Sequence, residues 1–244
     1  MQNQIVDPCP IGFSRLFQTG IVWMLFDAPF RSEQIDQARS IPLADLLVER
    51  FPMTFPAHDE DGFGPEDAAR LTGVSRETLA RIRVYLNALD VWRERINLIG
   101  PGEGRHLWRR HVLDSLQLME LISPDARAVA DLGSGAGFPG LVIACALAER
   151  PGASVTLVEK SPRKSEFLAA AIAEAGLPAQ VLNLRLEDKP PRKFDVVTAR
   201  ALAPLPKLLG YAYAWLKPSG KALLMKGRDA AAEVAAARKA WTFD

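Results

Sequence analysis

The sequence has little of what marks a secreted, disulfide-bonded or membrane-spanning protein. Only two of its 244 residues are cysteines, Cys9 and Cys145, so we expect neither a disulfide framework nor a metal site built on cysteines. The longest apolar run, residues 141–148, is too short to cross a bilayer. Because the N-terminus also lacks a charged region followed by a sustained apolar stretch, we expect a cytoplasmic protein without a signal peptide.

An excess of charge of either sign is missing as well. Lys and Arg number 30 and Asp and Glu number 29, which leaves a formal net charge of +1. A basic surface for a nucleic acid must therefore be local rather than spread over the whole protein. Hydrophobic residues make up 48% of the chain and charged residues 24%, which is typical of a globular protein with a sizeable core.

The N-terminal half divides into an irregular and a helical part. Residues 1–52 show no clean period, and we expect a poorly ordered extension there. From Ser75, a favoured N-cap residue, apolar side chains recur every three or four residues as far as Ile96, which predicts an amphipathic helix. After the break at residues 100–102, a second helix is predicted, and residues 53–126 are expected to form a helical cap. The apolar side of that second helix comprises Leu107, Val112, Leu116 and Met119.

Short apolar stretches then alternate with helical patterns over residues 127–244. Strands are predicted at residues 128–132, 154–159, 179–184, 194–198 and 221–225. Helices are predicted over residues 138–149, between the N-cap Ser161 and the terminating Gly176, between the last two strands and after the final strand. Such alternation indicates an α/β fold with a parallel sheet covered on both faces.

A glycine-rich loop, residues 131–137, follows the first strand and reads D-L-G-S-G-A-G. Gly133 and Gly135 allow the backbone to turn tightly and approach a ligand, and the next helix presents free N–H groups. A dinucleotide loop would read G-x-G-x-x-G, whereas Phe138 stands where that pattern needs glycine. The loop therefore favours a phosphate-free adenosyl ligand, S-adenosylmethionine, over a nicotinamide cofactor and an oxidoreductase. A purely structural turn is the alternative.

Three further candidates stand at strand ends. Glu159, about 20 residues beyond the loop, is placed to accept hydrogen bonds from ribose hydroxyls, or is a solvated charge. Leu186 and Glu187 follow the third strand, where they would contact adenine or belong to a surface turn. Arg200 follows the fourth strand and faces the ligand crevice, unless it forms a salt bridge to a neighbouring loop.

The absence of certain motifs reduces the number of chemical groups that could accept the methyl group. No Asp/Asn/Ser-Pro-Pro-aromatic tetrapeptide follows the fourth strand, which disfavours an exocyclic amine. Cys145 lies in the helix after the glycine loop, where core packing is the expected role, so carbon 5 of a pyrimidine is disfavoured too. Guanine N7 has an available lone pair and loses no proton on methylation, which agrees with the absence of an obvious general base.

A local basic patch extends from Trp92 to His111. It contains five arginines against two glutamates, with Trp92 and Trp108 interleaved. Two interpretations fit this pattern equally well. The patch is a phosphate-binding face, or it is an ordinary solvated helix face whose tryptophans belong to the core.

Five blocks in this order carry a resemblance to a known family. They are Asn97-Leu98, Arg110-His111-Val112-Leu113-Asp114-Ser115-Leu116, the loop from Asp131 to Gly140, Thr198-Ala199-Arg200-Ala201 and Met225-Lys226-Gly227. Over residues 75–241 the chain resembles the bacterial 16S rRNA guanine-N7 methyltransferases, also called glucose-inhibited division protein B. The block around His111 combined with G-x-G-x-G-F-P-G is specific, whereas the glycine loop alone is not.

The resemblance implies a Rossmann-like methyltransferase that uses S-adenosylmethionine on a guanine in the decoding-region loop of 16S rRNA. The substrate would be the rRNA or a small-subunit particle, and we expect a monomer. An RNA-binding module with a vestigial cofactor pocket is the alternative. The cofactor residues, from the residues and the resemblance together, would be Gly133, Gly135, Phe138, Glu159, Leu186, Glu187 and Arg200. Arg109, Arg110 and Lys226 would bind RNA, and Arg200 and His111 would position the substrate.

The chain departs from this family at both ends. The family lacks a counterpart of residues 1–52, and it continues past Phe243 with a final pair of antiparallel strands. We expect this chain to lack that pair and to leave an edge of its fifth strand uncovered.

Overall fold

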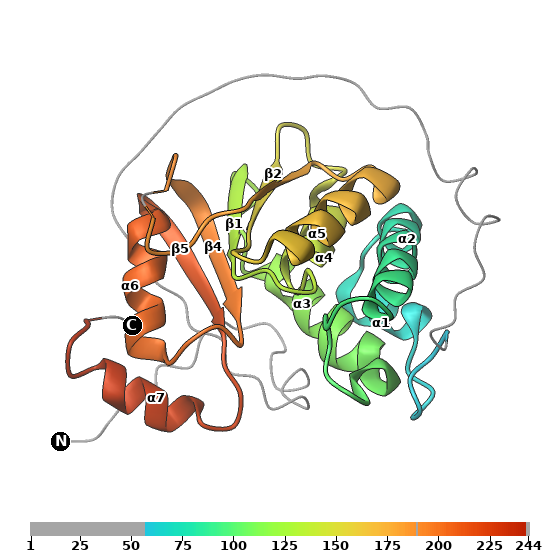
Figure 1. Ribbon diagram of the computed structural model, residues 1–244, viewed down its shortest axis with the longest axis horizontal. Helices are drawn as coiled ribbons and strands as arrows, with labels where there is room; N and C mark the ends of the chain where they lie inside the picture. The colour runs from blue at the N-terminus through green and yellow to red at the C-terminus, as the bar shows by residue number, and fades with distance from the viewer. Residues whose placement is uncertain (1–56, 189, 243–244) are drawn as a thin grey trace.

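The computed structural model describes residues 57–188 and 190–242 (Figure 1). The predicted extension, residues 1–52, and Cys9 lie outside the described residues. The described chain forms a parallel sheet with helices on both faces, which confirms the predicted Rossmann-like α/β fold. None of the described helices is long and apolar enough to cross a membrane.

Five parallel strands form the sheet, in the order β3-β2-β1-β4-β5. They are β1 (Ala128–Leu132), β2 (Ser154–Val158), β3 (Ala179–Leu182), β4 (Phe194–Arg200) and β5 (Leu216–Met225). The chain runs outward from β1 to β3 and then crosses back to place β4 on the other side of β1. In open α/β sheets this reversal opens a crevice at the carboxyl ends of the two central strands.

Helices cover the two faces of the sheet unequally. In Figure 1, α2 (Arg76–Arg93), α4 (Gly140–Leu147) and α5 (Pro162–Ala175) lie on one side, and α6 (Leu205–Trp215) and α7 (Ala230–Ala237) lie on the other. Each side has its own buried hydrophobic cluster. Phe194 and Trp215 stack at a centroid distance of 5.8 Å in the cluster beneath α6. Cys145 is fully buried in the opposite cluster, as predicted, and burial raises the pKa of its thiol.

The helical cap, residues 57–126, differs in part from the sequence-based prediction. Ser75 does begin α2, and its hydroxyl accepts a hydrogen bond from the Thr78 N–H at 3.0 Å. However, α2 is not the first helix of the cap, because α1 (Pro65–Thr72) precedes it.

The second predicted helix of the cap is an irregular run of short helices. They are the 3₁₀ helix η3 (Glu103–His106), the π-helix η4 (Trp108–Leu113), α3 (Asp114–Leu116) and the 3₁₀ helix η5 (Gln117–Glu120). Leu107 and Val112 are both buried although they stand five residues apart. A π turn, in which residues i and i+5 are linked, brings that spacing to one face, whereas an α-helix would not.

Strand β5 pairs with β4 alone and forms one edge of the described sheet. From Met225 to residue 242 the described chain forms α7 and adds no antiparallel strand pair. Trp241 covers part of α6, because its indole N–H donates to the Pro206 carbonyl at 3.2 Å.

Candidate active site

A cavity of about 770 Å³ opens at the carboxyl ends of β1, β2 and β4, where the strand order reverses. The glycine loop and the residues after β2, β3 and β4 form one side, and Leu98–Gly100 with η3 and η4 of the helical cap form the other. Nine predicted site residues line this cavity: Arg110, His111, Gly133, Gly135, Phe138, Glu159, Leu186, Glu187 and Arg200. The structure therefore brings together residues that are far apart in the sequence. The first and the last of the nine, Arg110 and Arg200, are 90 positions apart.

The glycine loop passes close to its neighbours and leaves open space on the cavity side. Gly133 has a φ of +69°, and a Cβ there would lie 2.5 Å from Leu202 Cδ1. Gly135 has a φ of +56°, and the nearest atom to a Cβ there would be the Gly133 carbonyl oxygen at 3.7 Å. Both residues use the left-handed backbone region that glycine tolerates best. The loop thus forms a cradle. A side chain at position 133 would collide with Leu202, and a side chain at position 135 would extend into the open space of the cavity.

Glu159 holds the glycine loop from the end of β2. One carboxylate oxygen accepts the Gly135 N–H at 3.0 Å, and the other accepts the Ser161 N–H at 2.8 Å. The residue is only 7% exposed, so it is not a solvated strand-end charge. Since a carboxylate has about four acceptor positions, Glu159 can hold the loop and still accept hydrogen bonds from a ligand in the cavity.

Tyr85 holds the same loop from the helical cap. Its hydroxyl donates to the Ala136 carbonyl at 2.7 Å, and its ring packs against Phe138 at a centroid distance of 5.3 Å. The side chain is fully buried, which raises the pKa of the phenol well above its usual value. Sequence reasoning missed this residue, because nothing in the apolar period of α2 indicates which loop its hydroxyl reaches.

A polar cluster of the cap and Arg200 line another part of the cavity wall. His111 Nε2 lies 2.8 Å from a Glu103 carboxylate oxygen, and its ring lies 4.9 Å from that of Phe138. Burial and the nearby positive charge of Arg200 lower the pKa of His111 to about 4, so its imidazole is neutral at pH 7. One guanidinium nitrogen of Arg200, Nη1, is buried without a hydrogen-bond partner in the described part of the chain. Such an orphaned donor beside a cavity is suited to a polar ligand group.

Asp131 belongs to the framework beneath the cavity. Its carboxylate accepts the Thr198 hydroxyl at 2.7 Å, which links β1 to β4 at the point where the strand order reverses. Burial raises the pKa of Asp131 to about 6. The Ser134 hydroxyl donates to the Asp131 carbonyl at 2.9 Å and tightens the first turn of the glycine loop.

Leu186 and Glu187 lie at the outer part of the cavity. Leu186 is half-buried, whereas Glu187 is exposed and accepts the Tyr211 hydroxyl at 2.6 Å. This hydrogen bond lowers the pKa of Glu187.

The three residues predicted to bind RNA occupy different environments. Arg109 donates to Asp61 at 2.9 Å and lies 4.2 Å over the Phe63 ring, outside the cavity wall. Lys226 is also outside that wall, and its ammonium lies 2.7 Å from a carboxylate oxygen of Glu233. Arg110 lines the cavity, is exposed, and lies 3.5 Å from Glu103.

Four cationic residues of the cavity wall were not singled out from the sequence. They are Lys160, Lys164, Arg185 and Lys207. Lys160 follows Glu159 directly and Lys164 stands five residues after Glu159, so their place at the carboxyl edge of the predicted sheet was an available signal.

A family pattern and individual relatives of this chain carry the same description, rRNA small subunit methyltransferase G. The sequence pattern of the family GidB, described as rRNA small subunit methyltransferase G, matches residues 78–244. Ribosomal RNA small subunit methyltransferase G of Paramagnetospirillum magneticum is 49% identical over 180 residues, covering 74% of this chain and 86% of that protein. The protein of the same name from Hyphomonas neptunium is 50% identical over 170 residues, covering 70% of this chain and 80% of its own.

Among solved structures, an S-adenosylmethionine-dependent O-methyltransferase from Thermotoga maritima superimposes with a TM-score of 0.46 at 15% identity. That comparison covers 62% of this chain and 54% of the other.

Proposed function

Because this chain belongs to the GidB family, rRNA small subunit methyltransferase G, we propose that it methylates N7 of a guanine in 16S rRNA with S-adenosylmethionine. The cavity at the strand reversal is the observation that supports this function best. It combines a glycine cradle, a buried carboxylate at the end of β2 and an orphaned arginine nitrogen in one space.

The residues around the cavity suit each part of S-adenosylmethionine. Glu159 would accept hydrogen bonds from the ribose, and the half-buried Leu184 and Leu186 would cover adenine. Gly133 and Gly135 would leave room for the methionine portion to pass close to the backbone. When bound, the cofactor supplies an electrophilic methyl carbon on a positively charged sulfur.

The chain's own groups suit an acceptor that keeps all its protons. The guanine N7 lone pair would accept the methyl group that the cofactor supplies, and the purine would take up the positive charge as the cofactor loses it. No proton must be removed, and His111 would remain a neutral wall residue. The Glu103 carboxylate faces the cavity beside His111, where it would stabilise positive charge developing on the purine. Arg200 Nη1 would donate to an acceptor of the bound substrate or cofactor.

The finer assignments rest on the family resemblance. We infer that the target lies in the decoding-region loop, that the substrate is the rRNA or a small-subunit particle, and that the enzyme acts as a cytoplasmic monomer. Arg110 would contact the RNA from the cap side of the cavity, since it is the exposed member of the predicted RNA-binding set on that wall.

The test is methylation of small-subunit rRNA from cells that lack the gene. The purified protein and S-adenosylmethionine should produce 7-methylguanosine, detected by nucleoside mass spectrometry and mapped to one position. Methylation at another atom would refute the N7 assignment. RNA binding without any methyl transfer would favour the vestigial-pocket alternative, and thermal protection by NADH instead of S-adenosylmethionine would favour an oxidoreductase.

A further inference from the structure

Four cationic side chains stand along the sheet side of the cavity, and together we call them the cationic lip. They are Lys160, Lys164, Arg185 and Lys207. We propose that the cationic lip binds the phosphate backbone of the substrate RNA next to the target guanine. This proposal rests on the proposed function and assigns the surface by which the same site holds its RNA.

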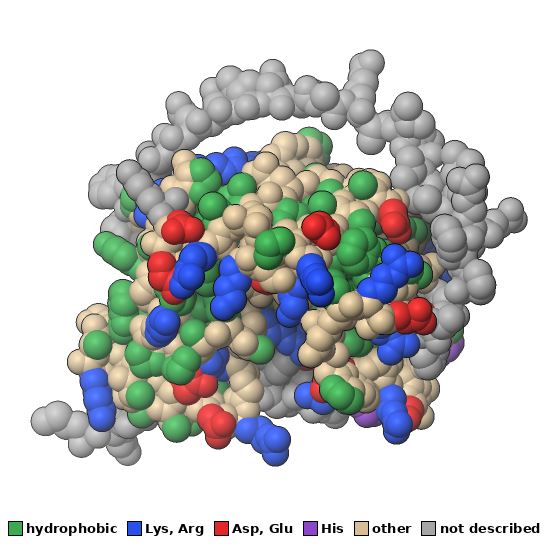
Figure 2. Space-filling model, viewed as in Figure 1, with side chains coloured by type: hydrophobic (Ala, Val, Ile, Leu, Met, Phe, Trp, Pro, Cys, Tyr) green, Lys and Arg blue, Asp and Glu red, His purple; other side chains and the backbone are tan. Residues whose placement is uncertain are grey.

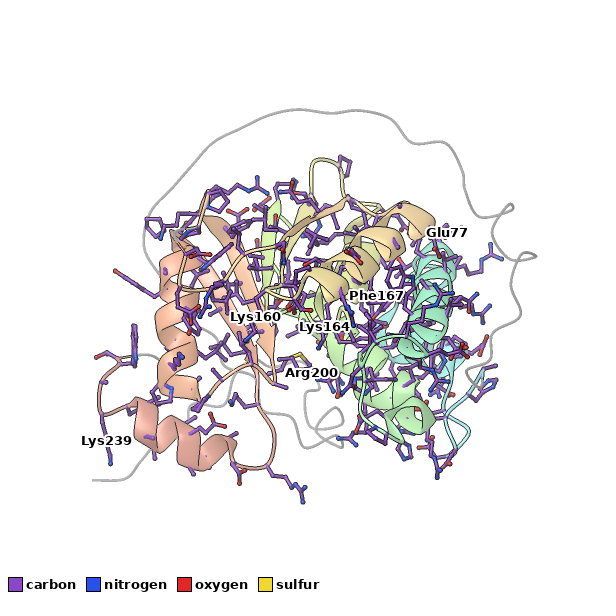
Figure 3. All side chains as sticks on the ribbon, in the orientation of Figure 1. Glu77, Lys160, Lys164, Phe167, Arg200 and Lys239 are labelled. Carbon is purple, nitrogen blue, oxygen red and sulfur yellow. The ribbon has the colours of Figure 1, made fainter. Side chains whose placement is uncertain are left out.

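The cationic lip draws its members from three separate parts of the fold. Lys160 follows β2 directly, and Lys164 lies in the first turn of α5. Arg185 follows β3, and Lys207 lies in the first turn of α6. Figure 3 shows Lys160 and Lys164 together near the carboxyl ends of the strands, close to Arg200. These elements meet at the same edge of the sheet because the strands are parallel. The fold, and not one highly charged segment of the sequence, therefore brings the four cations together.

The cavity is far more basic than the chain as a whole. The chain has a formal net charge of only +1. The wall of the cavity nevertheless carries six cationic side chains, Arg110, Lys160, Lys164, Arg185, Arg200 and Lys207, against the three carboxylates Glu103, Glu159 and Glu187. Figure 2 shows Lys and Arg side chains gathered across the middle of this face.

The charges of Lys160, Lys164 and Arg185 are largely available to a ligand, whereas Lys207 lies 5.4 Å over the Tyr211 ring. Neither Lys160 nor Lys164 has a salt-bridge partner within residues 57–188 and 190–242. Arg185 lies 3.7 Å from Glu187, but both side chains are more than half exposed, and exposed pairs of this kind contribute little. Arg109 and Lys226, by contrast, have carboxylates within 2.9 Å and 2.7 Å.

S-adenosylmethionine does not account for four further cations. It has one carboxylate and no phosphate, and its sulfur is itself positive. A nucleic-acid backbone places one negative charge at every nucleotide, and lysines on flexible stems bind such charges without fixed geometry. The cationic lip is therefore suited to bind the phosphates on either side of a guanine that enters the cavity.

The experiment measures binding of a labelled small-subunit rRNA transcript over a range of salt concentrations. The test variant is Lys160→Gln with Lys164→Gln. The matched control is Arg76→Gln with Lys239→Gln, which removes the same charge from two exposed residues outside the cavity wall. Figure 3 shows Lys239 far from Lys160, and Glu77, the neighbour of Arg76, at another edge of the molecule.

We expect the test variant to bind RNA more weakly and to lower the salt slope by about 1.4 to 1.8, the contribution of two phosphate contacts. The control should keep the wild-type slope, and the dissociation constant for S-adenosylmethionine should stay unchanged in both. A wild-type slope in the test variant would overturn the proposal. Weaker cofactor binding with an unchanged slope would assign the lysines to the cofactor instead. If the wild-type protein bound neither the transcript nor the small-subunit particle, the proposed function itself would fail.

Discussion

Replacing Tyr85 by Phe removes one oxygen atom from the hydrogen bond that joins the helical cap to the glycine loop. The Tyr85 hydroxyl lies 2.7 Å from the Ala136 carbonyl oxygen, and the tyrosine side chain is completely buried. Water cannot readily replace the lost donor, so the carbonyl would be left buried without this partner. The phenyl ring would keep its contact with Phe138, which lies 5.3 Å away between centroids.

The expected cost follows from these two facts. Leaving a buried hydrogen-bonding group without its partner costs about 1–3 kcal/mol, and we expect a loss of about 2 kcal/mol. For a domain of this size each kcal/mol corresponds to about 2–4 °C in Tm, so the melting temperature should fall by about 4–8 °C. The loop would also be held less firmly, and the dissociation constant for S-adenosylmethionine should rise by up to about tenfold, equivalent to 1.4 kcal/mol.

Urea unfolding and titration calorimetry measure both effects. Tyr213→Phe is the matched control, because it removes the same oxygen from a side chain that is 72% exposed. We expect the control to match the wild type in both assays. If the two variants unfolded at the same urea concentration, the hydrogen bond between the cap and the loop would contribute nothing to stability. Unchanged cofactor binding in a destabilised Tyr85→Phe protein would show that the cap does not order the loop.

The remaining predictions concern the cradle, the two carboxylates and the histidine. Gly133→Val should abolish S-adenosylmethionine binding in calorimetry, because a Cβ would lie 2.5 Å from Leu202 Cδ1 at a φ of +69°; normal affinity in a folded variant would remove the loop from the site. Glu159→Ala should weaken cofactor binding by about 1–3 kcal/mol and Glu187→Ala by less, so equal losses would contradict the assigned roles. His111 has a folded-state pKa of about 4, below the usual histidine value of 6.5, so it destabilises the folded state as the pH falls through that interval. The wild type should therefore gain stability over His111→Asn as the pH rises from about 4 to 6.5, and a pH-independent difference in urea unfolding would contradict this pKa.

Much of the fold was predictable because its boundaries are set by local chemistry. Ser75 and Ser161 accept hydrogen bonds from the first turns of α2 and α5, and Gly176 ends α5 at a φ of +59°. These signals depend only on neighbours in the sequence. The helix α1 was missed because its eight residues bury only Pro65 and Ala68, too few to produce a recognisable period. The π turn of η4 was missed because the apolar spacing of five was fitted to an α-helix.

The site was predictable where it depends on strand ends and not where it depends on contacts between distant segments. The place of Glu159 and Arg200 at the cavity was predictable because the carboxyl ends of parallel strands meet at one edge of the sheet. The hydrogen bond from the Gly135 N–H to Glu159 was not predictable, because it depends on the conformation of the loop. Likewise, no pattern in the sequence shows that Glu103 lies 2.8 Å from His111, since the two occupy different short helices.

The link between Asp131 and Thr198 has a consequence for folding kinetics. These residues are 67 positions apart, and Tyr85 is 51 positions from the carbonyl it contacts. Contacts of such sequence separation form late, because the entropy of closing a long loop is lost before the contact is made. The cavity and its glycine loop should therefore be among the last parts of the molecule to acquire their native conformation. A chain that has completed β1, β2 and β3 would still lack the strand that creates the cavity, so cofactor binding during refolding would report completion of the central sheet rather than its beginning.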